Sequence, residues 1–246
     1  MAKLVQKSGY IKSGKVSGYM RYIATREGVE KLAGNGSVTK GQRELIQKLL
    51  TDFPDAVELF EYEDYCNTPT LGTASAFISM ALDANLHEID SESGYMQYIA
   101  TRPRAQKRGI HGLFSSATAV DLASAISELE AHEGNVWTII YSLRREDADR
   151  LEYDNADAWR ALLMENAPTL AKSMKISLDN FHWYAAFHDE GHHPHIHMMV
   201  WSDDPKEGFL TKDGIAAMRS KLTNAIFRDE MQQIYERKDV AYSDLV

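Results

Sequence analysis

The stretch FHWYAAFHDEGHHPHIHMMVWS, residues 181–202, decides the fold class of this chain. Its two ends are rich in aromatic and branched residues, and a turn containing Gly and Pro separates them, which is typical of an antiparallel hairpin. Side chains alternate between the two faces of a strand, so Ile196, Met198 and Val200 are expected in the core. His195 and His197 then share the opposite face.

Five of the nine histidines fall within ten residues of this hairpin: His188, His192, His193, His195 and His197. The Cα atoms of His195 and His197 are expected about 6.6 Å apart, so both imidazoles can bind one ion. His188 ends the preceding strand and can supply a third nitrogen across the hairpin. Three histidines with open coordination positions are typical of a working metal site. A histidine-rich turn without a ligand is the alternative.

Two carboxylates lie in the same turn, Asp189 and Glu190. Each can be a metal ligand, a partner that orients an imidazole, a general base or a solvated turn residue. The sequence leaves these roles open.

The remaining pattern predicts an α+β fold in which helices flank a central antiparallel sheet. The stretch 61–72 is expected to be a loop, and a helical region is expected to break near Pro168. Thr39 is the expected cap of its helix. We expect strands over residues 3–11, 110–115 and 135–143, and helices over 16–33, 39–53, 73–84, 119–134, 144–174 and 211–238.

The composition of the 246 residues is that of an ordinary globular protein, with 44% hydrophobic and 26% charged residues. The chain has no apolar run of about 18 residues and no apolar segment near its start, so we expect neither membrane insertion nor a signal peptide. The single cysteine, Cys66, cannot form an internal disulfide. A cytoplasmic protein is therefore expected.

The net charge of −9 argues against nucleic acid, but the charge is unevenly distributed. Residues 1–48 hold ten basic and three acidic residues, a net charge of +7, whereas residues 49–92 hold ten acidic and no basic residues. The segment TRPRAQKRG, residues 101–109, has a charge of +4. We expect these basic segments to line the face that carries the three histidines, although a solvated surface is the simpler interpretation of any one cluster.

Both basic clusters accompany an internal repeat. SGYMRYIATRE, residues 17–27, recurs as SGYMQYIATRP, residues 93–103. Each copy has two tyrosines three residues apart, which would share one face of a helix. An aromatic stripe in the core is one interpretation of this spacing. A tyrosine nucleophile is the other.

A metal site and a tyrosine nucleophile together suggest an enzyme that transfers a phosphodiester group. A bound ion can polarise a phosphoryl oxygen, and a tyrosine hydroxyl can form a covalent intermediate. Basic residues near the tyrosines would then hold neighbouring phosphates.

Together these motifs resemble those of a known family. His188, Glu190, His193, His195 and His197 resemble the HUH motif of plasmid relaxases, although many relatives have Asp in place of Glu190 and Asn in place of His193. In detail, the chain resembles MobL/MobP-type relaxases of mobilizable elements. The phrases YIATREGVEKL, YIATRPR, HGLFS, SLRREDADRL, WYAAFHDEGHHPHIHMMVWS and GFLTKDGI carry this resemblance.

The resemblance implies an HUH relaxase-like sandwich and a single relaxase domain over 1–246 with a helical, acidic insert at about 34–92. It implies an enzyme that nicks one strand of DNA at an origin of transfer and is joined to the 5′ phosphate through tyrosine. Tyr22 is the first candidate nucleophile and Tyr98 the second, and Tyr19 and Tyr95 are the remaining candidates. Glu190 is a further catalytic residue.

The resemblance also implies Mg²⁺ or Mn²⁺ held by His188, His195 and His197. Single-stranded DNA would be the substrate, and relaxosome accessory proteins and a coupling protein would be partners. The DNA-binding candidates are Arg26, Arg102, Arg104, Lys107 and Arg108.

Two other interpretations stay open. An HUH replication initiator or transposase would share the site but act on a different DNA element. A non-catalytic DNA-binding or metal-containing module would keep the histidines for structure alone.

Overall fold

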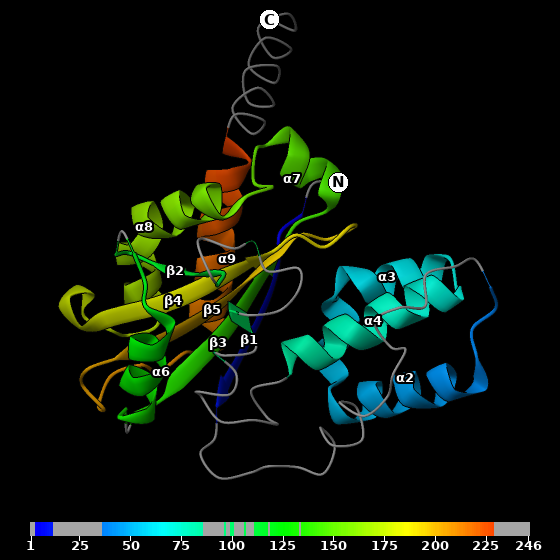
Figure 1. Ribbon diagram of the computed structural model, residues 1–246, viewed down its shortest axis with the longest axis horizontal. Coiled ribbons are helices and arrows are strands. Elements are labelled where there is room, and N and C mark those ends of the chain that lie inside the picture. Colours follow the sequence, from blue (N-terminus) through cyan, green and yellow to red (C-terminus); the bar gives the residue numbers. More distant parts are fainter. Residues whose placement is uncertain are drawn as a thin grey trace, which may run out of the picture.

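A computed structural model describes residues 3–11, 36–85, 96, 99–100, 106, 111–117, 119–132 and 134–228 (Figure 1). Within these residues, five strands form a sheet in the order β1-β3-β5-β4-β2, and every neighbouring pair is antiparallel. The predicted hairpin is present as β4 and β5, and β5 is the central strand. The strands are β1 (Val5–Ile11), β2 (Leu113–Ser115), β3 (Val136–Ser142), β4 (Phe181–His188) and β5 (His195–Ser202).

One face of the sheet is covered by helices α8 (Ala156–Ser173) and α9 (Lys212–Ile226), and α9 passes behind the strands in Figure 1. Ile196, Met198 and Val200 of β5 are fully buried in the apolar cluster on this face, as predicted. We call this side of the sheet the apolar face. Burial of this large apolar area is the main favourable contribution to folding.

The expected break at Pro168 is wrong, because α8 continues through this residue. Pro168 removes one N–H donor from the helix. Leu163 and Leu170, on either side of it, are buried in the cluster of the apolar face, and such packing supplies most of the stability of a helix in a protein. The region 144–174 is interrupted earlier instead, between α7 (Arg145–Arg150) and α8.

The other side of the sheet carries His188, His195 and His197, and we call it the histidine face. Helix α6 (Leu122–Glu130) packs on part of this face in a cluster that includes Trp201. Met96, Ile99 and Ala100 of the second repeat copy are fully buried in the same cluster. The described part of the second repeat thus packs with residues of the histidine face.

Residues 36–85 form a group of helices beside the sheet (Figure 1). The group contains α2 (Lys40–Asp52), the 3-10 helix η1 (Pro54–Glu58), α3 (Phe60–Asn67) and α4 (Leu71–Ala84). These helices share an apolar cluster of their own, to which the sheet adds Ile140 of β3. We call this group the α2–α4 segment.

The loop expected over 61–72 is wrong, because α3 occupies much of it. Acidic residues alternate with aromatic ones there, so the sequence shows little of the periodicity that marks a helix. The helix is held by its neighbours: the rings of Tyr62 and Tyr65 lie 5.1 and 6.3 Å from the ring of Phe77 in α4, measured between centroids.

The predicted α+β class, with helices around an antiparallel sheet, is confirmed. Thr39 caps α2 as predicted, in a capping box with Gln42. The expected helix over 16–33 and the part of 211–238 that follows residue 228 lie outside the described residues. No helix in the described ranges is long and apolar enough to cross a bilayer.

Candidate metal centre

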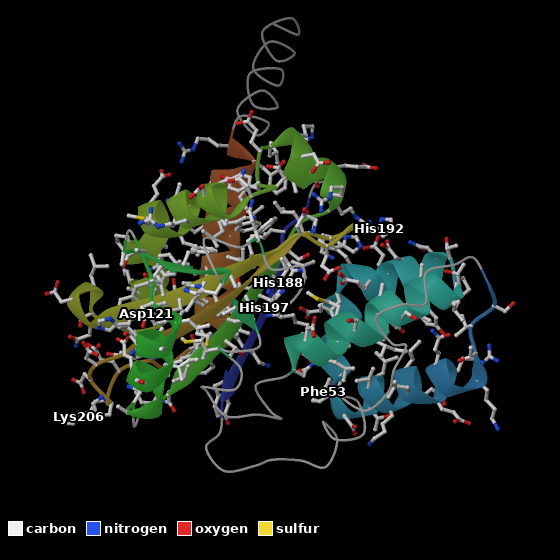
Figure 2. All side chains as sticks on the ribbon, in the orientation of Figure 1. Phe53, Asp121, His188, His192, His197 and Lys206 are labelled. Carbon is white, nitrogen blue, oxygen red and sulfur yellow. The ribbon has the colours of Figure 1, made fainter. Side chains whose placement is uncertain are left out.

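Three histidines of β4 and β5 converge on the histidine face. His188 lies directly opposite His195 in the strand register, and His197 follows two residues along β5. The centroids of the three imidazole rings are 4.6 to 5.2 Å apart. One nitrogen from each ring can be chosen so that all three nitrogens lie within 4.8 Å of one another. Figure 2 shows His188 and His197 in the middle of the molecule, and all three side chains are buried.

Backbone carbonyls assign the lone pairs of two of these rings. Nε2–H of His188 donates to the carbonyl of Ile99 at 2.9 Å, and Nδ1–H of His195 donates to the carbonyl of His193 at 3.0 Å. A neutral imidazole has one N–H and one lone pair, so the lone pairs belong to Nδ1 of His188 and Nε2 of His195. Metal-binding histidines are usually held through the other nitrogen in this way. The donor set therefore fits a divalent metal ion.

Arg145, at the start of α7, holds the turn between β4 and β5. Its guanidinium donates to the carboxylate of Asp189 at 2.5 Å and to the carbonyls of Glu190 and Gly191 at 2.5 and 3.2 Å. Its backbone N–H donates to the carbonyl of His192 at 2.8 Å. Asp189 thus has its carboxylate engaged by a cation, whereas Arg145 contacts Glu190 through the main chain.

His193 connects the same turn to helix α3. Its Nε2 lies 2.7 Å from the carboxylate of Asp64, and its ring stacks on Phe60 with the centroids 5.2 Å apart. Arg144 reaches the same two residues, with its guanidinium 3.2 Å from the Asp64 carboxylate and 4.8 Å from the Phe60 centroid. His193 itself is only 4% exposed.

The charges of this contact follow from its surroundings. Burial lowers the pKa of His193 and outweighs the opposing effect of Asp64. Burial alone would raise the pKa of Asp64, but His193 and Arg144 outweigh it, so the pKa of this carboxyl lies below its ordinary value. Asp64 is therefore an ionised hydrogen-bond acceptor at neutral pH.

Glu61, next to Phe60 on α3, is a buried carboxyl near the same turn. Burial raises its pKa to about 8, and the negative charges of Asp64, Glu190 and Asp83 also act to raise it. Helix α3 thus brings one ionised and one largely neutral carboxyl to the side of the hairpin.

The comparisons with known proteins identify the family. The family model described as MobL relaxases matches residues 1–246, which is the whole chain. The chain belongs to the MobL relaxase family. No curated protein and no solved structure matches it. Family membership gives the chain the role of a relaxase, and the family implies an enzyme that nicks DNA and binds single-stranded DNA.

Of the predicted site residues of this relaxase, the structure brings His188, His195 and His197 together and places Glu190 in the adjoining turn. The other predicted residues are Tyr19, Tyr22, Tyr95, Tyr98, Arg26, Arg102, Arg104, Lys107 and Arg108, and all of them lie outside the described residues.

Sequence reasoning missed the groups that hold the relaxase histidines in place. Ile99 acts through a backbone carbonyl, for which a sequence carries no signal. Asp64 is 129 residues away from His193 and stands among many other acidic residues. The paired arginines Arg144 and Arg145 directly after a predicted strand were the available signal, because arginine is the usual partner for carboxylates and carbonyls.

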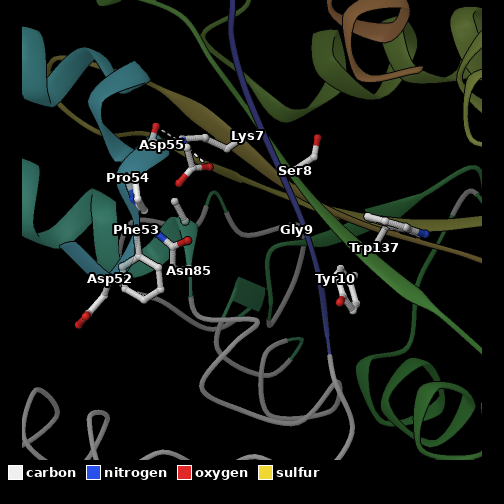
Figure 3. A pocket seen from close by; sticks show the side chains of 11 residues that line it. Lys7, Ser8, Gly9, Tyr10, Asp52, Phe53, Pro54, Asp55, Asn85 and Trp137 are labelled. Carbon is white, nitrogen blue, oxygen red and sulfur yellow. Dashed lines mark hydrogen bonds and ion pairs between the residues drawn. The ribbon is translucent and has the colours of Figure 1, made fainter. Parts of the chain in front are cut away.

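A pocket of about 380 Å³ lies between β1 and the α2–α4 segment of the relaxase (Figure 3). Its wall includes Lys7, Tyr10, Phe53, Asp55 and Trp137. Lys7 is opposite Ile140, which is opposite His197, so this lysine lies in the same row of the histidine face. Its ammonium group pairs with the Asp55 carboxylate at 2.7 Å, so its charge is balanced within the protein.

Proposed function

We propose that this MobL relaxase nicks one DNA strand at an origin of transfer through a tyrosine nucleophile and a three-histidine metal centre of the HUH type. The observation that carries the proposal is the convergence of His188, His195 and His197 within a chain of a DNA-nicking family. Three neutral nitrogen ligands leave coordination positions for a substrate.

His188, His195 and His197 would hold the ion. When bound, it supplies a positive charge that polarises the scissile phosphate. Imidazole nitrogens bind Mn²⁺ more readily than Mg²⁺, whose preferred ligands are oxygens, so we expect Mn²⁺ to support the reaction at the lower concentration.

The chemistry assigned to the chain is a transfer of the phosphoryl group to tyrosine. The phenolic oxygen forms a bond to phosphorus, the bond from phosphorus to the 3′ oxygen breaks, and the 3′ oxygen takes a proton. The products are a 5′-phosphotyrosyl enzyme and a free 3′ hydroxyl. Glu190 is the proposed acceptor of the phenolic proton, because it lies two residues after His188 and because the carboxylate of its neighbour Asp189 is engaged by Arg145.

Tyr22 is the proposed nucleophile, from its place after the first strand in the family order. Tyr98 is the second candidate, and one contact favours it. Ile99, the next residue in the chain, accepts the hydrogen bond from His188 at 2.9 Å. A two-step scheme in which Tyr22 nicks and Tyr98 serves a second transfer would use both copies of the repeat.

Single-stranded DNA at the origin is the proposed substrate. The basic residues proposed to hold phosphates on either side of the nick each lie within or just after one of the two repeat copies; they are Arg26, Arg102, Arg104, Lys107 and Arg108. Relaxosome accessory proteins and a coupling protein are the proposed partners. The enzyme would work in the cytoplasm.

The test is incubation of the full chain with single-stranded origin DNA and Mn²⁺, followed by denaturing electrophoresis. We expect a covalent adduct that is lost on chelation of the metal and lost in Tyr22→Phe, while DNA binding by that variant is unchanged. Undiminished adduct in Tyr22→Phe and its loss in Tyr98→Phe would transfer the role to Tyr98. Binding without cleavage under all conditions would contradict the proposal.

A further inference from the structure

The β4–β5 turn is held on its two sides by different parts of the chain. Arg145 binds the backbone and the carboxylate at the tip of the turn, as described above. On the other side, His193 is enclosed by helix α3, which comes from the distant α2–α4 segment. Through His193, the contact with α3 leads to the metal ligand His195.

The link between α3 and His195 is the backbone of His193. The side chain of His193 is fixed by Asp64 and Phe60, and its carbonyl accepts the Nδ1–H of His195 at 3.0 Å. Fixing the side chain of a residue with two strong contacts restricts the orientation of its peptide group. The orientation of that carbonyl selects the tautomer of His195 and aims its Nε2 toward the other two rings.

We propose that Asp64 of helix α3 is a positioning residue of the metal centre, acting on His195 through the side chain and carbonyl of His193. The α2–α4 segment thereby orders a metal ligand that it does not itself contribute. This inference rests on the proposed function, since it assumes that His195 binds a metal ion.

The chain offers a matched control at the next position. Glu63 and Asp64 both contact Arg144 at 3.2 Å, but only Asp64 contacts His193. Glu63→Ala and Asp64→Ala each remove one carboxylate from the same turn of the same helix. Asp64→Asn removes the charge but keeps an oxygen that accepts a hydrogen bond from Nε2 of His193.

The experiment measures the affinity of the full chain for Mn²⁺ by competition with a fluorescent chelator, without DNA. Partners that orient metal-binding histidines typically contribute 10- to 100-fold to affinity. Because Asp64 acts through an intervening residue, we expect an effect at the lower end of this range, with about 10-fold weaker Mn²⁺ binding in Asp64→Ala. The Mn²⁺ affinity of Asp64→Asn should lie within about 3-fold of wild type. That of Glu63→Ala should not change.

A second measurement separates positioning from a general loss of structure. In ¹⁵N spectra of the metal-free protein, His195 of wild type and Glu63→Ala should show the Nδ1–H tautomer, and Asp64→Ala should show a mixture. If Asp64→Ala does not fold, Phe60→Leu replaces it, because leucine keeps most of the apolar volume but loses the stacking on His193. It should weaken Mn²⁺ binding in the same direction.

Equal Mn²⁺ affinity in wild type, Asp64→Ala and Glu63→Ala would overturn the positioning role and leave the proposed function intact. Unchanged affinity in Phe60→Leu would overturn it equally if Asp64→Ala does not fold. A wild-type chain whose Mn²⁺ binding does not depend on His195 would contradict the proposed function as well. The two failures are therefore distinguishable.

Discussion

The two faces of the five-stranded sheet differ in what covers them. The apolar face is packed against α8 and α9 by one large cluster that includes Trp159, Ile196 and Met198. The histidine face is covered by two separate clusters, one with α6 and one with the α2–α4 segment. His188 and His197 are fully buried polar residues on this face.

This difference shows how one strand serves stability and chemistry together. Along β5, His195 and His197 alternate with Ile196 and Met198, so neighbouring residues face opposite sides. A continuous apolar core on one side fixes the strand. The polar groups on the other side are then held at set positions, which a preorganised reaction centre requires.

The largest effect is expected from a substitution on the histidine face. His195→Ala removes one of three ligands, so we expect loss of Mn²⁺ binding and a drop in nicking of about 10³-fold or more, since a bound metal contributes several kcal/mol to such reactions. Cleavage of origin DNA and metal stoichiometry measure this. His192→Ala is the control, because His192 lies in the turn just before β5, is exposed and is outside the triad. Unchanged metal stoichiometry in His195→Ala would rule out the three-histidine site.

A substitution on the apolar face should lower stability and leave metal binding unchanged. Ile196→Ala, one residue away, leaves a cavity against α8 and α9 and should lower the free energy of unfolding by about 2–5 kcal/mol. The folded variant should bind Mn²⁺ with the affinity of wild type. Urea unfolding and chelator competition test the two halves of this prediction. A large loss of metal affinity with little loss of stability would show that the faces are not independent.

A smaller effect, on the pH dependence of stability, is expected at Glu61, which lies beside the histidine face. Its ordinary pKa is 4.5 and burial raises the pKa to about 8. Below pH 4.5 both folded and unfolded chains hold the proton. Between pH 4.5 and 8 the unfolded chain loses the proton first, so rising pH destabilises the fold.

Glu61→Gln removes this dependence. We expect the variant to be more stable than wild type by up to about 4 kcal/mol at about pH 8, with the difference shrinking toward about pH 5. Thermal or urea unfolding across that pH range measures it. A difference that stays constant with pH would show that the Glu61 carboxyl is not buried in its neutral form.

The hairpin was predictable from sequence because its signals are local. Alternation of His195, Ile196, His197 and Met198 assigns faces without knowledge of any other strand. His188 could be placed because a short turn forces the end of β4 opposite the start of β5. The α+β class followed from the order of strands and helices.

The parts that sequence could not supply depend on distant contacts. Helix α3 is stabilised by packing on α4 and by the pairing of Asp64 with His193, neither of which leaves a periodic pattern. The continuity of α8 at Pro168 depends on burial of the residues around it. The hydrogen bond between His188 and the carbonyl of Ile99 forms only once the chain has folded.

The most direct test of the central claim is to map the DNA-linked peptide by mass spectrometry after a reaction with Mn²⁺. Trypsin releases Tyr22 in the five-residue peptide YIATR, residues 22–26. It releases Tyr98 in the much longer peptide 49–104, because no lysine or arginine lies between Lys48 and Arg102 and cleavage before Pro103 is blocked. We predict a nucleotide on YIATR, or, if the second repeat copy carries the nucleophile, on Tyr98 within peptide 49–104, where fragment ions distinguish it from Tyr62, Tyr65 and Tyr95. A nucleotide on neither peptide, or an adduct that forms equally well in His195→Ala, would contradict the claim.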